Sequence, residues 1–299
     1  GKDPSGRYLI AIDGTGTKDW LSNSLNPQKL PNGRWLSHVR KFAEDHSPGE
    51  NNEHYDFGPS DGAFASDLPA IMERAYQSLI RYRSKSVQNR NEPVDIIGWS
   101  RGAYAAMLLA RRLSEGSPRL DGTWDSTPVQ VRFLGLYDPV DMTQYDGLGY
   151  GTVANVTANV RAAVWVHGIE RTGDALRFWG NARDYDAESI YVWNNWPRIQ
   201  ATFDPSTSVY DFPKLATHGA IGGTPGYSAD QQSPYNYSLD VQMSFETDRS
   251  MREIASSYGV PINVMPRQAY GFPAEQGQLP KVKPKPSRPY IPFMIRTDY

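Results

Sequence analysis

The chain has 299 residues, of which 39% are hydrophobic and 21% charged, and its formal net charge is -2. This length suits one α/β domain with a sizeable core, and the balanced charge argues against nucleic acid as a partner. Because there is no cysteine, disulfides, zinc–thiolate sites and thiol nucleophiles are excluded. The longest nearly apolar stretch, Ala103–Ala110, is far shorter than the roughly 20 residues of a membrane span, so we expect no transmembrane segment.

The first half of the chain predicts alternating strands and helices. Apolar runs bounded by turn residues predict the strands, and apolar residues at helical spacing predict the helices. The expected strands are Arg7–Ile12, Val94–Trp99 and Val131–Tyr137, and the expected helices are Ser66–Arg83 and Gly102–Leu113. This order is typical of parallel βαβ units, so we expect an α/β fold with a mostly parallel central sheet and helices on both faces.

The pattern weakens after Asp138, where the sequence becomes rich in Gly, Asn, Asp and Thr. We interpret residues 141–207 as an insertion near the active-site end, with candidate elements at Val160–Val166 and Ser189–Trp193. Its aromatic segments, Ala162–Trp179 and Tyr191–Trp196, would form a lid or acyl pocket, although aromatic clusters are more often plain core.

Three further segments complete a single predicted domain over residues 1–299. They are a β-like piece at Ser208–Phe212, a helix at Asp248–Tyr258 and an extended, Pro-rich tail over residues 275–299. We find no internal repeat that would indicate a solenoid or a tandem array.

One motif carries most of the chemical information. Gly98-Trp99-Ser100-Arg101-Gly102 fits G-x-S-x-G and lies directly between a predicted strand and a predicted helix. The pattern by itself is common enough to occur by chance. At a tight strand–helix turn, however, a serine hydroxyl projects away from the sheet. Small residues are then needed two positions before and after it, and both are glycine. Ser100 is therefore the candidate nucleophile.

The oxyanion formed in acyl transfer needs two backbone N–H donors. The N–H of Arg101 is one candidate, because it follows the serine at a helix N-terminus. The second should come from the loop after another strand, where Asp13-Gly14-Thr15-Gly16 offers Gly14 or Thr15. The rival interpretation is a phosphate-binding loop, but G-x-x-x-x-G-K-[ST] is absent and Lys18 is wrongly placed for it.

A serine nucleophile needs a base, almost always histidine, and in folds with this turn the order is Ser, acid, His. Of the five histidines, only His167 and His218 follow Ser100. His218 begins a Gly-rich segment after a β-like stretch, where a base can reach over the sheet edge. His167 lies in an apolar run and fits a packed core residue better, so His218 is the favoured base.

The acid should orient that base from the carboxyl end of a strand. Asp138 stands immediately after the predicted strand Val131–Tyr137 and before Pro139. A solvated loop aspartate is the plain alternative, and Asp141 and Asp211 are reserve candidates.

The segments IDGTG, GWSRGA, LGLYDPV and THGAIGG resemble a family of uncharacterised bacterial and fungal α/β hydrolases that includes phospholipase effectors of the type VI secretion system. The resemblance spans roughly residues 8–226 and implies an α/β-hydrolase fold with lipid esters as substrates. It also implies a triad of Ser100, Asp138 and His218, with Asp13 shaping the oxyanion loop. This chain departs from the family in having Trp99 in place of the usual Phe, and Tyr-Asp-Pro-Val in place of Trp-Asp-Thr-Val.

The sequence therefore predicts a serine hydrolase that cleaves carboxylic esters, with a small-molecule or lipid ester as substrate. No metal or organic cofactor is needed, and a lipid ester would bring peripheral contact with a membrane. Two alternatives stay open: a catalytically silent scaffold that docks through its Pro-rich tail, and an acyltransferase that uses the same acyl-enzyme. Eight Trp and eighteen Tyr favour an exported protein over a cytosolic one, and the oligomeric state is left open.

Overall fold

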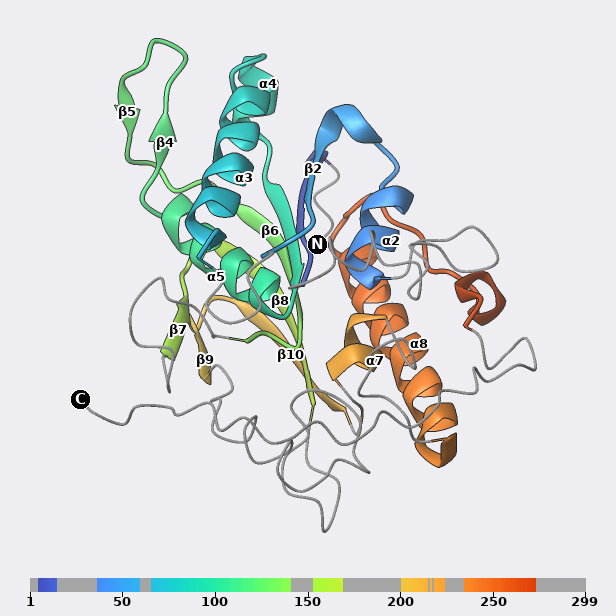
Figure 1. The fold of residues 1–299 in the computed structure, drawn as a ribbon. Coiled ribbons are helices and arrows are strands. Elements are labelled where there is room, and N and C mark those ends of the chain that lie inside the picture. Colours follow the sequence, from blue (N-terminus) through green and yellow to red (C-terminus); the bar gives the residue numbers. More distant parts are fainter. Residues whose placement is uncertain are drawn as a thin grey trace.

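The computed structural model describes residues 5–14, 37–59, 66–140, 153–168, 200–214, 216, 218–223 and 234–272. At its centre is a six-stranded sheet in the order β10-β8-β6-β3-β1-β2, and all its pairings are parallel (Figure 1). The strands are β1 (Tyr8–Ile12), β2 (Glu53–Asp56), β3 (Val94–Trp99), β6 (Val131–Tyr137), β8 (Val160–Gly168) and β10 (Ser208–Lys214). Because the chain leaves β1 toward β2 and returns to β3 on its other side, the strand order reverses between β1 and β3. Ligands bind at such switch points, beyond the carboxyl ends of the strands.

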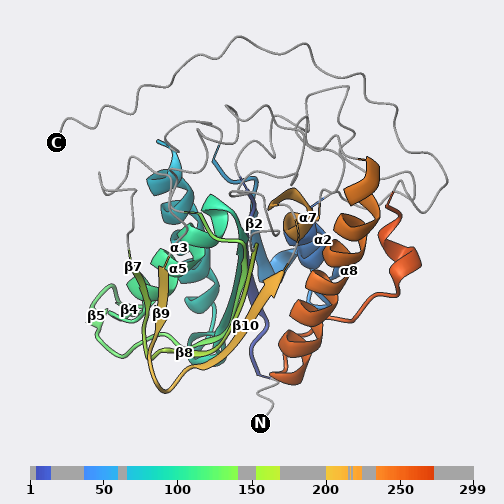
Figure 2. The same cartoon turned by 90° about the horizontal axis from the view of Figure 1, so that it is seen from below.

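Helices cover both faces of the sheet, as expected (Figure 2). On one face lie α3 (Leu68–Arg83) and α5 (Arg101–Leu113), and on the other lie α2 (His38–Asp45), α7 (His218–Gly222) and α8 (Pro234–Ser257). Alternate strand residues feed the two cores: Ile10 packs on the α3 and α5 side, whereas Leu9 packs on the α2 and α8 side. Burial on both faces explains why β1, β3 and β6 are almost wholly apolar. The exceptions, Asp95 of β3 and Arg132 of β6, are buried and pair with each other, with Arg132 Nε donating to Asp95 Oδ1 at 2.9 Å.

Smaller elements complete the described part of the chain. They are α4 (Val87–Asn91), the hairpin of β4 (Ser117–Pro118) and β5 (Trp124–Asp125), the parallel pair β7 (Val153–Val156) and β9 (Gln200–Phe203), and the 3₁₀ turns Glu50–Asn52 and Arg267–Tyr270. Among the helices described, none combines the length and apolarity that a membrane crossing requires.

The structure corrects two expectations from the sequence. The interpretation of residues 141–207 as an insertion is wrong for β8, which lies between β6 and β10 in the central sheet. The last helix begins at Pro234, fourteen residues before the expected start at Asp248. The candidate element Ser189–Trp193 and the tail over 275–299 lie outside the described residues.

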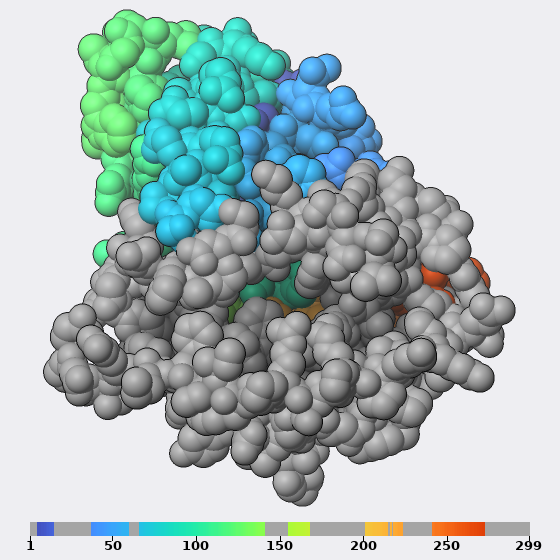
Figure 3. Space-filling model, viewed as in Figure 1, coloured from blue at the N-terminus to red at the C-terminus, as the bar shows by residue number. Residues whose placement is uncertain are grey.

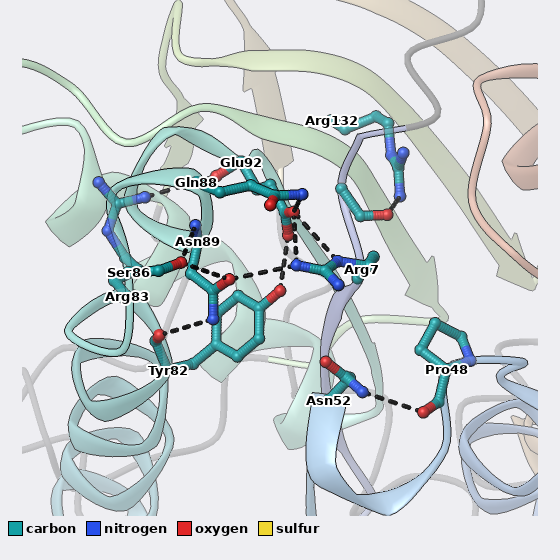
Figure 4. A network of polar contacts seen from close by, with 11 residues as sticks. Arg7, Pro48, Asn52, Tyr82, Arg83, Ser86, Gln88, Asn89, Glu92 and Arg132 are labelled. Atoms are coloured by element: carbon teal, nitrogen blue, oxygen red, sulfur yellow. Dashed lines mark hydrogen bonds and ion pairs between the residues drawn. The ribbon is translucent and has the colours of Figure 1, made fainter.

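A polar network ties the start of β1 to the helices at the amino end of the sheet (Figure 4). Glu92, just before β3, accepts hydrogen bonds from Arg7 Nε at 3.0 Å and from the Tyr82 hydroxyl at 2.6 Å. Beside it, Arg90 of α4 donates to Pro118 O of the hairpin at 2.7 Å. Figure 3 shows these segments side by side on the surface, with the hairpin in green and α3 in cyan. The amino end of the sheet is thus held together by polar contacts.

A buried ion pair anchors α8 to β6, the strand that ends at Tyr137, directly before Asp138. Asp248 accepts from Arg252 Nε at 2.7 Å and from the Tyr137 hydroxyl at 2.7 Å, and Arg252 also donates to Asp45 of α2 at 2.8 Å. Burial, the largest single effect, raises the pKa of Asp248, but the charge of Arg252 and the hydrogen bonds from Tyr270 and Tyr137 together outweigh it and hold that pKa below its usual range. Because a buried pair is costly to break, this network fixes α8 and α2 on the sheet.

Candidate functional site

Ser100 occupies the tight turn between β3 and α5. Its backbone has φ of 59° and ψ of -128°, a conformation that L residues rarely adopt. Holding a non-glycine residue there costs about 1–3 kcal/mol, which the surrounding structure must supply. Such strain is concentrated at functional sites, and this backbone geometry projects the side chain beyond the end of the sheet at a strand–helix turn.

Both glycines of the motif are required by close backbone contacts. A Cβ on Gly98 would lie 2.4 Å from Gly102 O, and a Cβ on Gly102 would lie 2.3 Å from the carbonyl oxygen of Asp13. The neighbouring atoms are main-chain atoms that cannot move aside, so any larger residue would push α5 away from β1 and β3. The spacing of glycines around Ser100 therefore sets how closely the start of α5 approaches the loop after β1.

Main-chain hydrogen bonds join Ser100 to the segment that carries Asp138. Ser100 N donates to Tyr137 O at 3.0 Å, and Val140 N donates to Ser100 O at 3.1 Å. The Ser100 hydroxyl is buried, and it has no hydrogen-bond partner among the residues that the structure describes. A buried hydroxyl without a hydrogen-bond partner lowers the free energy of unfolding by about 1–3 kcal/mol, so it calls for a functional explanation.

Asp138 and His218 form a direct hydrogen bond at the carboxyl end of the sheet. Asp138 follows β6 with a positive φ of 45°, and its N–H donates to Val166 O at 2.7 Å. Its Oδ2 lies 2.7 Å from Nδ1 of His218, the first residue of α7. A carboxylate can only accept, so Nδ1 carries the proton and Nε2 keeps the lone pair. The sequence expectation placed these two residues together, and the structure does so.

The carboxyl group of Asp13 lies at the end of β1 and is fully buried. It accepts hydrogen bonds from Ser37 Oγ at 2.5 Å, from the Tyr55 hydroxyl at 2.6 Å and from Gly14 N at 2.9 Å. Burial raises the pKa of Asp13 to about 6, although these three donors act in the opposite direction. Asp13 thus holds together the segments after β1, before α2 and in β2, beside the first turn of α5.

This arrangement bears on the expected oxyanion donors. The N–H of Gly14 already donates to Asp13 Oδ1, so that hydrogen bond competes with the role expected of Gly14. Thr15 lies outside the described residues. Arg101 is the first residue of α5, and its backbone N–H belongs to the helix N-terminus that follows Ser100. Of the three expected donors, Arg101 is the one whose placement fits the role.

Replacing Asp13 by asparagine is expected to remove one contribution to the pH dependence of stability, a loss of stability as pH rises between about 4 and 6. Burial lowers the pKa of His38 to about 3 and of His46 to about 4, and these shifts act in the opposite direction, so stability should rise more steeply with pH in the variant than in the wild type. Because the folded pKa of about 6 exceeds the ordinary aspartate pKa of 3.8, only the folded state binds a proton on this group between these values. The contribution of Asp13 to the free energy of unfolding is fully present below about pH 3.8 and is lost as the pH rises through 6. A pKa difference of about two corresponds to about 3 kcal/mol.

Urea unfolding of the wild type and of Asp13→Asn from pH 4 to 7 measures this slope. The exposed Asp121→Asn is the control: the pKa of Asp121 is lowered, so its removal should leave the slope unchanged in this range or make stability rise less with pH, opposite to Asp13→Asn. Equal slopes for the wild type and Asp13→Asn would mean that Asp13 ionises normally in the folded protein.

The reserve candidates lie elsewhere. His167 and Asp211 form their own pair, with Nε2 and Oδ1 2.6 Å apart, on the neighbouring strands β8 and β10. His167 stacks on Trp165, which packs on the α3 and α5 face, whereas α7 packs on the opposite face. This second His–Asp pair is therefore separated by the sheet from α7. Asp141 lies outside the described residues.

Sequence reasoning missed three residues that surround the site: Ser37, Tyr55 and the side chain of Trp99. Ser37 caps α2 by accepting from Arg40 N, and no signal in the sequence connects it to Asp13, 24 positions earlier.

Within the described ranges, no three His, Asp or Glu side chains gather as a metal site would require.

Comparison with known proteins adds only distant likeness to solved structures. No protein-family model and no curated protein matches the sequence. Among solved structures, an uncharacterized protein from Pseudomonas aeruginosa aligns with 68% of this chain at 17% identity and a TM-score of 0.36. The aligned part spans 30% of that chain, well under half of its length. A match this weak assigns neither a family nor an activity.

Proposed function

We propose that the chain is a serine hydrolase of the α/β-hydrolase type that cleaves carboxylic esters through an acyl-enzyme on Ser100. The observation that carries this proposal is the hydrogen bond of 2.7 Å between Asp138 and His218 beside the strained turn of Ser100. A nucleophile, an orienting acid and a base, in the order Ser, Asp, His and at the carboxyl ends of parallel strands, form the arrangement that acyl transfer needs.

In the proposed reaction, His218 Nε2 takes the proton of the Ser100 hydroxyl as Oγ bonds to the ester carbonyl carbon. The backbone N–H of Arg101, at the positive end of the α5 dipole, stabilises the oxyanion. When the tetrahedral intermediate collapses, the alcohol leaves with the proton from His218. A water molecule then gives a proton to His218 and attacks the acyl group, which releases the carboxylic acid and restores Ser100.

The buried Asp138 holds the imidazole in the tautomer that this sequence of steps requires and stabilises the imidazolium. In this structure the Ser100 hydroxyl has no partner among the described residues, so its bond to the base belongs to the substrate-bound state. Catalytic hydrogen bonds commonly tighten only when substrate binds. Lipid or phospholipid esters are the substrate class that the family resemblance implies, and we include them in the proposal.

Covalent labelling with an alkyl fluorophosphonate tests this function without knowledge of the substrate. Ser100 Oγ should attack phosphorus and displace fluoride, while its proton passes to His218. We expect mass spectrometry of the digested protein to locate one phosphonate group, on the peptide that contains Ser100. Ser84, which is exposed at the end of α3, is the matched control and should stay unlabelled. The absence of any label on the folded protein would favour the catalytically silent scaffold instead.

A further inference from the structure

The indole of Trp99 lies where three parts of the site meet. Trp99 is the last residue of β3 and is 3% exposed. Its ring centroid lies 5.6 Å from that of His218, with the planes inclined at 34°. A Cβ added to Gly14 would lie 2.8 Å from Trp99 Cε3, and one added to Gly222 would lie 2.0 Å from Trp99 Cε2. The backbones of Gly14 and Gly222 therefore both rest directly on the indole.

These contacts matter because α7 cannot position itself. It has five residues, from His218 to Gly222, and a single helical turn is unstable in isolation. His218 and Gly222 are four positions apart, so they share one face of α7, and that face lies against Trp99. The placement of the His218 imidazole is therefore set by what α7 packs on.

We propose that Trp99 is a positioning residue of the site, because its indole supports both ends of α7. Since Ser100 directly follows Trp99 in the chain, this support fixes the position of His218 relative to Ser100. The same ring supports Gly14 in the loop after β1, beside the Asp13 carboxyl group. This inference rests on the proposed hydrolase function for its consequence in catalysis, but the placement itself can be tested separately.

The expected result is a loss of turnover rather than of substrate binding. Trp99→Ala should lower kcat for ester hydrolysis by about 100-fold, because a displacement of about 1 Å in a catalytic group has an effect of this size. KM should stay within about threefold, since the indole is not expected to contact the substrate. Trp99→Phe keeps an aromatic support and should restore kcat to within about tenfold of the wild type. Trp124→Ala, at an exposed position of the hairpin, is the control and should leave both constants unchanged.

A second measurement tests the contact without any activity. Gly222→Ala should lower the Tm by about 5 °C or more in the wild-type background, because its methyl group would overlap the indole. In the Trp99→Ala background the methyl group enters the vacated space, so the same substitution should lower the Tm much less. Additive effects of the two substitutions would contradict direct packing of Gly222 on Trp99.

Imidazole NMR spectra provide the third measurement. Trp99→Ala should shift the ring-proton resonances of His218, identified by their loss in His218→Gln, and leave those of His54 in place. If the wild type hydrolyses esters and Trp99→Ala retains full kcat, the positioning role is overturned. If the Tm values are additive and the His218 signals do not move, the placement itself is overturned. If the wild type hydrolyses no ester while coupling and shifts are present, the placement stands and the hydrolase function fails.

Discussion

Replacing Ser100 by alanine is expected to lower kcat for ester hydrolysis by about 10⁴-fold to 10⁶-fold, because removal of a serine nucleophile has an effect of this size. The fold should be unaffected. Alanine has a Cβ like serine, so the strain at the φ of 59° is the same in both proteins. Because the Ser100 hydroxyl is buried without a partner among the described residues, its removal should leave the Tm unchanged or raise it slightly.

Hydrolysis of a short and a long p-nitrophenyl ester, and of a phospholipid in vesicles, measures this prediction, with circular dichroism to compare folding. Ser117→Ala is a matched control, because Ser117 is also a buried serine but lies on β4 at the opposite end of the sheet. We expect it to retain full activity. Hydrolysis by folded Ser100→Ala at the wild-type rate would exclude Ser100 as the nucleophile. The ratio of the two ester rates distinguishes an esterase from a lipase.

The strands at the centre of the sheet could be predicted from the sequence because strands that are buried on both faces have a mostly apolar composition. β3 and β6 have the expected bounds, since every residue in them is buried and all are apolar except Asp95 and Arg132, which pair with each other. The turn at Ser100 was likewise predictable, because the motif requires glycine two positions before and two positions after the serine. At each of these glycines a Cβ atom would lie only 2.3–2.4 Å from a main-chain oxygen. These are local signals, and they need no knowledge of distant segments.

Elements whose partners are distant in sequence were harder to predict. The first part of α8 was missed, and its described residues include the buried polar side chains Ser244 and Thr247, which break the apolar period of a helix. The edge strand β2 has the polar sequence Glu-His-Tyr-Asp and gives no alternation. For β8, the apolar run was recognised, but Gly- and Asn-rich flanks concealed that it pairs with β6.

The same distinction applies to the candidate site. The G-x-S-x-G motif, the chain order and the positions of the predicted strands led to Ser100, Asp138 and His218, and a hydrogen bond joins the last two. The surroundings of Asp13 depend on Ser37 and Tyr55, which reach it only in the folded protein. That Gly14 donates to the Asp13 carboxyl group also needed coordinates, because the sequence indicated only a tight turn with several N–H groups.

Replacing Asp138 by asparagine should lower kcat by about 10⁴-fold, which is the effect of removing the orienting carboxylate from a Ser-His-Asp triad. Asparagine tolerates the positive φ of 45° as well as aspartate does, so the backbone after β6 should be preserved. The amide can present an N–H to His218 Nδ1, which favours the tautomer with its proton on Nε2. That tautomer cannot accept the proton of Ser100.

The second His–Asp pair supplies the matched control for this substitution. Asp211→Asn removes a carboxylate that lies 2.6 Å from a histidine nitrogen, as Asp138 lies 2.7 Å from His218, but on the opposite face of the sheet from α7. We expect it to keep wild-type kcat and KM for the same p-nitrophenyl esters. The reverse result, with activity lost in Asp211→Asn and kept in Asp138→Asn, would assign the acid to Asp211 and the base to His167. Loss in both variants at equal Tm would mean that the two pairs act on one reaction, and the triad proposed here would be incomplete.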